Sequence, residues 1–283
     1  MNRYILLLIA LICVELSYAQ YAYFGSRGKI TFDRTMYTRA RMREMMSNSN
    51  PNTNRSFRGG RDVSTLPEST TQQMELFFDE DHTLMRHIVD EEAGSGSRSA
   101  VRTGGGARGR QGRGATGNAP RANVRSMNAQ KTIYQDLKKA TSEMQVTIDE
   151  KYILSDSLSP ITWRFTDEYR NIAGMECRRV NGATKDSLYL IAFYTDQIPV
   201  SAGPALSHGL PGMILGLVIP EMHIQYWATE VSYTNDPVPN DWRDKKSHMM
   251  TLDEFSDTLG HFFRRRGNTN DSFRRRVLEQ LIY

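Results

Sequence analysis

Cysteine is scarce in this 283-residue sequence, which holds only Cys13 and Cys177. Cys13 lies in an apolar N-terminal run that we expect to be removed, so Cys177 has no partner for an intrachain disulfide. A free cysteine is most often a small buried hydrophobe, and this is how we interpret Cys177. The alternative is a reactive thiol, but no nucleophile signature surrounds it.

Long apolar runs are also few. The run Ile5–Val14 follows Arg3, precedes Ser17-Tyr18-Ala19, and is too short to span a bilayer. This pattern predicts a signal peptide over residues 1–19, with a signal anchor as the alternative. We therefore expect an exported protein, periplasmic or associated with the outer membrane, that does not span the membrane after cleavage.

Recognisable catalytic motifs are missing as well. The sequence contains no nucleophile elbow, zinc helix, phosphate-binding loop or dinucleotide fingerprint. We predict a non-enzymatic protein without a cofactor. A hydrolase that uses Cys177, with His208 as a conceivable partner, is the less favoured alternative.

Histidine and methionine invite a metal hypothesis, because imidazole and thioether ligands suit copper. The sequence has six His and fourteen Met. Their spacing fits no compact ligand set, so we predict no metal site and keep an envelope copper- or zinc-binding protein as an alternative. The local candidates are His82, Met85 and His87; Met222 and His223; and His248, Met249 and Met250.

One segment has no apolar periodicity at all. Residues 93–127 are rich in Gly and Arg, and we predict that they form a disordered insert. Because we expect an exported protein, this basic charge does not indicate a nucleic acid as the binding partner. An anionic envelope surface is the more suitable partner, and a solvated linker is the simplest account.

Alternating apolar residues elsewhere predict strands. Asn181-Gly182, between two such runs, is typical of a type I′ hairpin turn. The predicted strands lie at residues 28–34, 74–78, 83–85, 144–148, 152–154, 161–165, 177–180 and 188–194.

The most distinctive stretch lies between residues 201 and 231. A type II turn is predicted at Gly209-Leu210-Pro211-Gly212, with positive φ at Gly212. A strand buried on both faces follows at residues 213–219, and a half-buried strand follows Pro220. We interpret Gly203, Pro204, Gly209, Leu210, Pro211 and Gly212 as one rigid loop, structural or for docking.

Ile198-Pro199-Val200-Ser201, Gly203-Pro204 and Gly209-Leu210-Pro211-Gly212-Met213-Ile214 together resemble the signature of the GLPGLI family of exported Bacteroidota proteins. Met213 stands where the family name has a second Leu. The resemblance covers residues 28–95 and 128–234. The family has no known function, and the resemblance implies work alongside TonB-dependent outer-membrane transporters.

We therefore expect a mainly β fold, with a single domain at residues 20–234 and a curved antiparallel sheet. By analogy it would be a half-barrel similar to lipoprotein carriers, wrapped around an apolar cavity. Residues 235–283 are predicted to form a linker and helices. Thr251 and Glu254 have the spacing of a capping box, and Asp271 is placed to begin a second helix.

Overall fold

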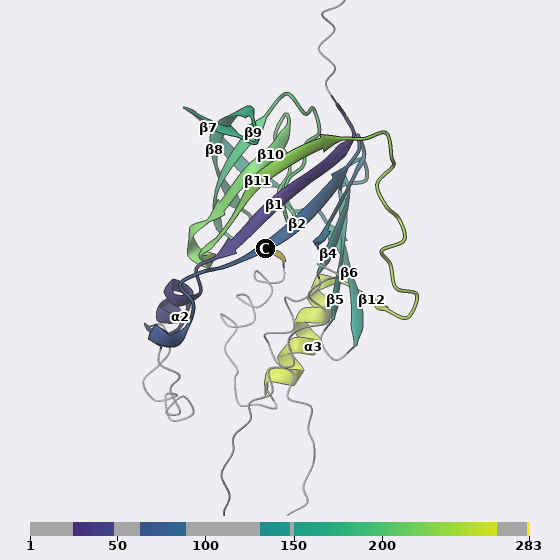
Figure 1. The fold of residues 1–283 in the computed structure, drawn as a ribbon. Coiled ribbons are helices and arrows are strands. Elements are labelled where there is room, and N and C mark those ends of the chain that lie inside the picture. Colours follow the sequence, from purple (N-terminus) through teal and green to yellow (C-terminus); the bar gives the residue numbers. More distant parts are fainter. Residues whose placement is uncertain (1–24, 48–62, 89–130, 148–149, 265–281) are drawn as a thin grey trace, which may run out of the picture.

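The computed structural model describes residues 25–47, 63–88, 131–147, 150–264 and 282–283 (Figure 1). Its strands form one sheet in the order β12-β6-β5-β4-β3-β2-β1-β11-β10-β9-β8-β7. The strands are β1 (Gly28–Met36), β2 (Thr70–Phe78), β3 (His82–His87), β4 (Thr132–Asp136), β5 (Thr141–Thr147), β6 (Lys151–Ser157), β7 (Ile161–Ile172), β8 (Met175–Thr184), β9 (Tyr189–Thr195), β10 (Met213–Ile219), β11 (Ile224–Tyr233) and β12 (His248–Met250). The α-helices are α2 (Thr38–Ser47) and α3 (Leu252–Arg264).

The sheet consists of two antiparallel meanders that meet at β1. One runs from β1 to β6 and the other from β7 to β11, and each strand pairs with the next along the chain. Pairing between β1 and β11 joins the meanders, with Gly28 opposite Tyr233 and Met36 opposite Ile224. The first strand of the described chain therefore lies in the middle of the sheet.

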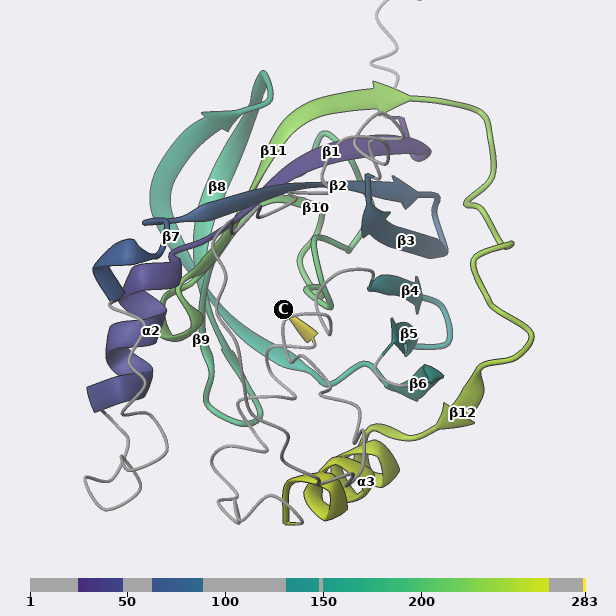
Figure 2. The same ribbon diagram turned by 60° about the horizontal axis from the view of Figure 1, so that its bottom comes forward.

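The sheet is strongly curved but open, and this confirms the expected fold class. The connection from β6 to β7 carries the chain between opposite ends of the sheet, yet it spans only residues 158–160. Four peptide units reach at most about 14 Å, so the two ends must come close together. Figure 2 shows the resulting curl, with the end of the chain on its concave side.

A parallel strand and a helix follow the last antiparallel pair. β12 lies parallel to β6, with His248 opposite Tyr152. The predicted capping box begins α3: the Thr251 backbone N–H donates to Glu254 Oε2 at 2.8 Å, and the Glu254 N–H donates to Thr251 Oγ1 at 3.2 Å. Phe255 is buried and lies 5.7 Å from the Tyr152 ring, which anchors the helix to β6.

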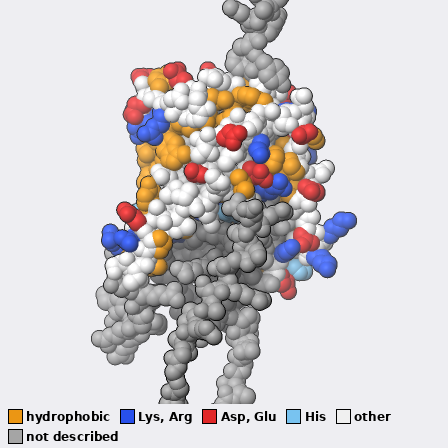
Figure 3. All heavy atoms as spheres, in the orientation of Figure 1, with side chains coloured by type: hydrophobic (Ala, Val, Ile, Leu, Met, Phe, Trp, Pro, Cys, Tyr) orange, Lys and Arg blue, Asp and Glu red, His pale blue; other side chains and the backbone are white. Residues whose placement is uncertain are grey.

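Several predictions concern residues outside those that the structure describes. They are the signal peptide at residues 1–19, the insert at 93–127 and a helix starting at Asp271. Within the described part of the chain, no helix is long and apolar enough to cross a membrane. The described outward side chains in the view of Figure 3 mix acidic, basic and apolar types.

The hairpin predicted at Asn181-Gly182 is wrong. β8 runs straight through both residues, and the tight turn lies earlier, at Ala173 and Gly174, whose φ angles are +51° and +82°. Gly182 faces Trp163 on β7, and a Cβ at Gly182 would lie 2.4 Å from the Trp163 ring. This glycine therefore makes room for an indole ring within the sheet.

Candidate functional site

The loop between β9 and β10 turns into the concave side of the sheet (Figure 2). Its Ala205 reaches the opposite meander: Gln135 Nε2 on β4 donates to the Ala205 carbonyl at 3.0 Å, and the Ala205 N–H donates to Met85 Sδ on β3 at 3.2 Å. Ala205 and Ser207 are fully buried. The loop therefore fills much of the space where an apolar cavity was expected.

Gly203 and Gly212 of this loop have a structural role that differs from the predicted type II turn. Positive φ occurs at Ala205 and Gly209 and not at Gly212, so the type II turn prediction is wrong. A Cβ at Gly212 would lie 2.0 Å from the Thr195 carbonyl oxygen, and one at Gly203 would lie 2.5 Å from Ile214 Cβ. Close approach of the backbone to its neighbours explains both glycines.

Hydrogen bonds hold the rim of the loop to the sheet. Trp163 Nε1 donates to the His208 carbonyl at 2.9 Å, and the Gly209 N–H donates to Ser201 Oγ at 3.1 Å. Of the six motif residues only two are exposed, Gly209 and Pro211. Gly203, Pro204, Leu210 and Gly212 are buried, so most of the motif packs inside the protein.

The Cys177 thiol is enclosed. The side chain is fully buried in the core, and Sγ donates to the Met175 carbonyl at 3.5 Å. Burial raises the pKa of the thiol to about 12. A nucleophilic thiolate is therefore disfavoured near neutral pH.

The histidine candidates His82, His223 and His248 pair with three different carboxylates. His82 lies 3.2 Å from Asp79, His223 lies 2.7 Å from Glu44, and His248 lies 3.2 Å from Glu150. Among the residues described, no three His, Cys, Asp or Glu side chains are grouped so that they could hold a metal ion.

A row of polar side chains crosses the concave face on three adjacent strands. Arg34 on β1 pairs in register with Tyr226 on β11 and with Gln72 on β2. Arg34 Nε donates to the Tyr226 hydroxyl at 3.0 Å and to the Tyr283 main-chain oxygen at 3.1 Å, while Nη1 donates to Gln72 Oε1 at 3.4 Å. Tyr226 also donates to the Tyr283 oxygen. We call Arg34, Tyr226 and Gln72 the polar row.

Two basic side chains are buried in this interior. Arg34 and Lys131 are each only 2% exposed. Lys131 Nζ donates to the Ile282 carbonyl at 3.4 Å, and burial together with the Arg34 charge holds the Lys131 pKa well below its ordinary value. The buried carboxylate of the described core, Asp136, pairs with Lys139 at 2.8 Å.

One donor of this row has no acceptor. Arg34 Nη2 is buried and makes no hydrogen bond. In a guanidinium group, Nη2 and the Nε–H lie on the same edge, which is the edge that binds a carboxylate through two parallel bonds. On that edge, Nε donates to the Tyr283 main-chain oxygen.

Sequence reasoning missed the polar row, although a signal was present. Ile30 and Phe32 alternate as inward positions of β1, and Arg34 occupies the next inward position. A charged residue that continues an apolar alternation is expected to be buried and paired, or to serve a function.

Two cavities lined by described residues border the sheet. The first cavity, of about 140 Å³, lies between the two ends of the sheet and is lined by Met144, Leu154 and Leu188. Ile282 and Tyr283 also line it, so it lies beside the polar row. Its lining also includes the charged side chains Asp156, Lys185 and Asp186.

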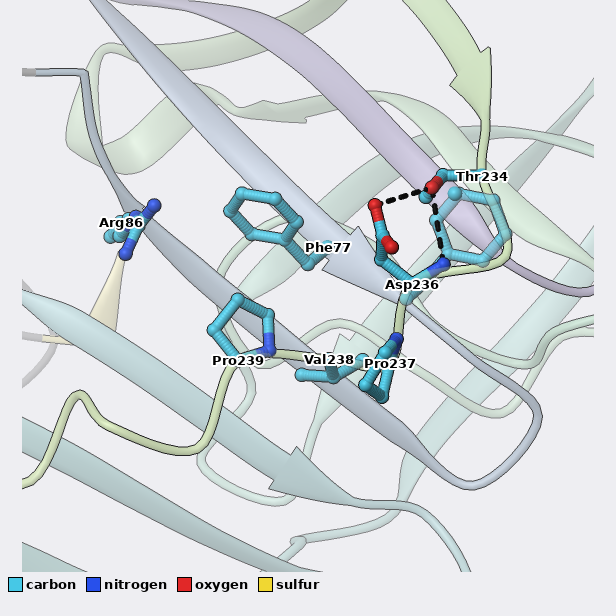
Figure 4. A pocket seen from close by; sticks show the side chains of 9 residues that line it. Phe77, Arg86, Thr234, Asp236, Pro237, Val238 and Pro239 are labelled. Carbon is cyan, nitrogen blue, oxygen red and sulfur yellow. Dashed lines mark hydrogen bonds between the residues drawn. The ribbon is translucent and has the colours of Figure 1, made fainter.

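The second cavity, of about 230 Å³, lies between β2 and the segment after β11 (Figure 4). Its guanidinium group, Arg86, lies over the Phe77 ring at 5.0 Å and pairs with Glu75 at 2.6 Å. Thr234 Oγ1 donates to Asp236 at 2.9 Å. These polar groups are satisfied by one another, in contrast to Arg34.

A family model described as a protein of unknown function (Porph_ging) matches residues 119–216, which include the loop at 203–212. No curated protein matches the chain. Two solved structures of PNGF-II, in space groups C2 and P21, are similar, with TM-scores of 0.49 and 0.48 and identities of 12% and 13%. The matches cover 82% and 83% of this chain but 32% and 33% of those chains, so this chain spans about a third of their length.

Proposed function

We propose that this protein is an exported, non-enzymatic binding protein of the cell envelope and a member of the GLPGLI family. One observation carries the binding function: a buried arginine, Arg34, has an unsatisfied donor on the concave side of the sheet. A buried donor without an acceptor is costly for folding, and a native group that carries this cost is a candidate to bind a ligand or an ion. An anion that reached Arg34 would remove the cost.

The ligand test uses the full chain purified from its native envelope under gentle conditions. Native mass spectrometry should detect a bound acidic small molecule that is released on denaturation. The Arg34→Met variant should lack it, whereas Arg164→Met, which removes an exposed arginine from β7, should retain it. Equal occupancy of all three proteins, or none in the wild type, would refute a site at Arg34.

Export and envelope association are supported by the leader-like residues 1–19. We further propose that the protein works with an outer-membrane transporter, as the family resemblance implies. Cell fractionation with N-terminal sequencing should find a chain that begins at Gln20 outside the cytoplasm. Crosslinking in the intact envelope should then enrich one transporter, and recovery of background proteins alone would contradict the partnership.

A further inference from the structure

We infer that strands β3 to β6 form a second site on the concave face, which binds a small neutral amphiphile with a hydroxyl-rich head. The site uses none of the residues of the polar row at Arg34, so it goes beyond the proposed function. Two rows of side chains, two unsatisfied polar atoms and a bordering cavity support this assignment.

Four polar side chains lie in register across β3, β4, β5 and β6, which stand next to one another on one side of the curl (Figure 2). They are Thr83, Gln135, Ser142 and Asp156, each directly opposite the next, and we call them the second polar row. Opposed residues of antiparallel strands share a face, with Cβ atoms about 4.5–5.5 Å apart. The first three are buried and Asp156 is exposed, so the row leads from the interior to the surface.

An apolar row runs beside the second polar row on the same face. It consists of Met85, Ile133, Met144 and Leu154, which are again opposite one another and are all buried. Each lies two residues along its strand from a member of the polar row, a step of about 6.8 Å that returns to the same face. The face therefore presents polar atoms and hydrocarbon side by side, which suits an amphipathic molecule.

The loop between β9 and β10 covers the inner half of both rows. Gln135 Nε2 donates to the Ala205 carbonyl, and Met85 Sδ accepts the Ala205 N–H. The first bond fixes the orientation of the amide, so the remaining group of Gln135 is the acceptor Oε1. This Oε1 and the neighbouring Thr83 hydroxyl are buried without a hydrogen-bond partner among the described residues. A hydroxyl group suits them because it both donates and accepts, whereas a charged group there would be costly.

The outer half of both rows borders the cavity of about 140 Å³ between the ends of the sheet. Ser142, Met144, Leu154 and Asp156 all line it, and so does Leu206, which follows Ala205 in the loop. Its volume lies below the roughly 300–1,000 Å³ of drug-sized sites, so the cavity suits a small molecule. The polar and apolar rows meet open space here.

Polar groups at this open end are mainly acceptors. Asp156 Oδ1 accepts the Ser157 N–H at 2.7 Å and the Ser157 hydroxyl at 3.4 Å, while Oδ2 has no partner in the described part of the chain. The Ser142 hydroxyl makes only a long bond, 3.5 Å, to the Asp156 carbonyl. Hydroxyl groups of a ligand supply the missing donors without adding charge.

Calorimetry on the full chain should compare butyl β-glucoside, glucose, 1-butanol and butylamine. We expect the glucoside to bind about tenfold or more tightly than each of the others, because only it offers hydroxyls to the polar row and an alkyl chain to the apolar row. Comparable binding of glucose would exclude the apolar row, and comparable binding of butanol would exclude the polar row. Comparable binding of butylamine would indicate an ammonium site at Asp156. Each of these results, or no binding of the glucoside, would overturn the inference.

Two variants locate the ligand. Ser142→Ala and Asp156→Ala each remove one hydrogen-bonding group and should weaken glucoside binding about fivefold. The matched control Asp167→Ala removes a fully exposed carboxylate from β7 and should bind as the wild type does. Unchanged affinity in either variant, with an unaltered circular dichroism spectrum, would place the ligand elsewhere and refute the site. The wild-type comparison of probes needs no substitution, so it stands even where a variant misfolds.

Discussion

Replacing Arg34 by Met is expected to destabilise the fold, although it removes one unsatisfied donor. Arg34 is 2% exposed, and its Nη2 donor is unsatisfied, which costs about 1–3 kcal/mol. The substitution also removes the bonds from Arg34 Nε to the Tyr226 hydroxyl and the Tyr283 oxygen, both in the buried interior, and the bond from Nη1 to half-buried Gln72. Methionine is unbranched and apolar, so it can follow the course of the arginine stem.

The three lost hydrogen bonds of Arg34, about 1.5–3 kcal/mol each for a charged donor, outweigh the relief of that one donor. We expect a net decrease in the free energy of unfolding of about 2–4 kcal/mol. Urea unfolding followed by tryptophan fluorescence should show a lower midpoint with an unchanged slope. The control Arg164→Met should stay within about 0.5 kcal/mol of wild type. An unchanged or higher midpoint in Arg34→Met would show that the buried guanidinium contributes no net stability, and it would refute the reasoning.

Three further predictions concern Lys131, Cys177 and the glycines of the β9–β10 loop. The Lys131 pKa lies well below its ordinary value of 10.5 in the folded chain, so between these two pKa values the unfolded chain binds a proton that the folded chain lacks. The free energy of unfolding should therefore rise with pH up to about 10.5. Urea titrations should show this rise in the wild type and not in Lys131→Met. Cys177, with a pKa raised to about 12, should resist iodoacetamide at pH 8 until urea is added, as read by mass spectrometry; rapid native labelling would contradict its burial. Gly212→Ala should lower the free energy of unfolding by about 3 kcal/mol, because the added Cβ would clash with the Thr195 carbonyl. Gly209→Ala should lower it by only about 1–2 kcal/mol, through the strain of positive φ at a residue other than glycine. Equal shifts in melting temperature for the two variants would show that the structure relieves the clash.

Local patterns in the sequence determined many of the elements. The apolar run Met213–Ile219 predicted a strand buried on both faces, and six of its seven residues are buried. Alternation after Pro220 predicted the half-buried β11, and the spacing of Thr251 and Glu254 predicted the start of α3. These signals are local because side-chain periodicity and capping depend on residues a few positions apart.

The tertiary structure alone decided which residues meet. The β1–β11 pair joins residues about two hundred positions apart, and no local pattern encodes that partner. That long-range pairing turned Arg34 into a buried cation beside Tyr226. A second pairing, between β7 and β8, placed Trp163 over Gly182, where a turn was predicted. Asn-Gly and Pro-Gly sequences permit a tight turn, but strand pairing and packing determine whether the backbone forms one there.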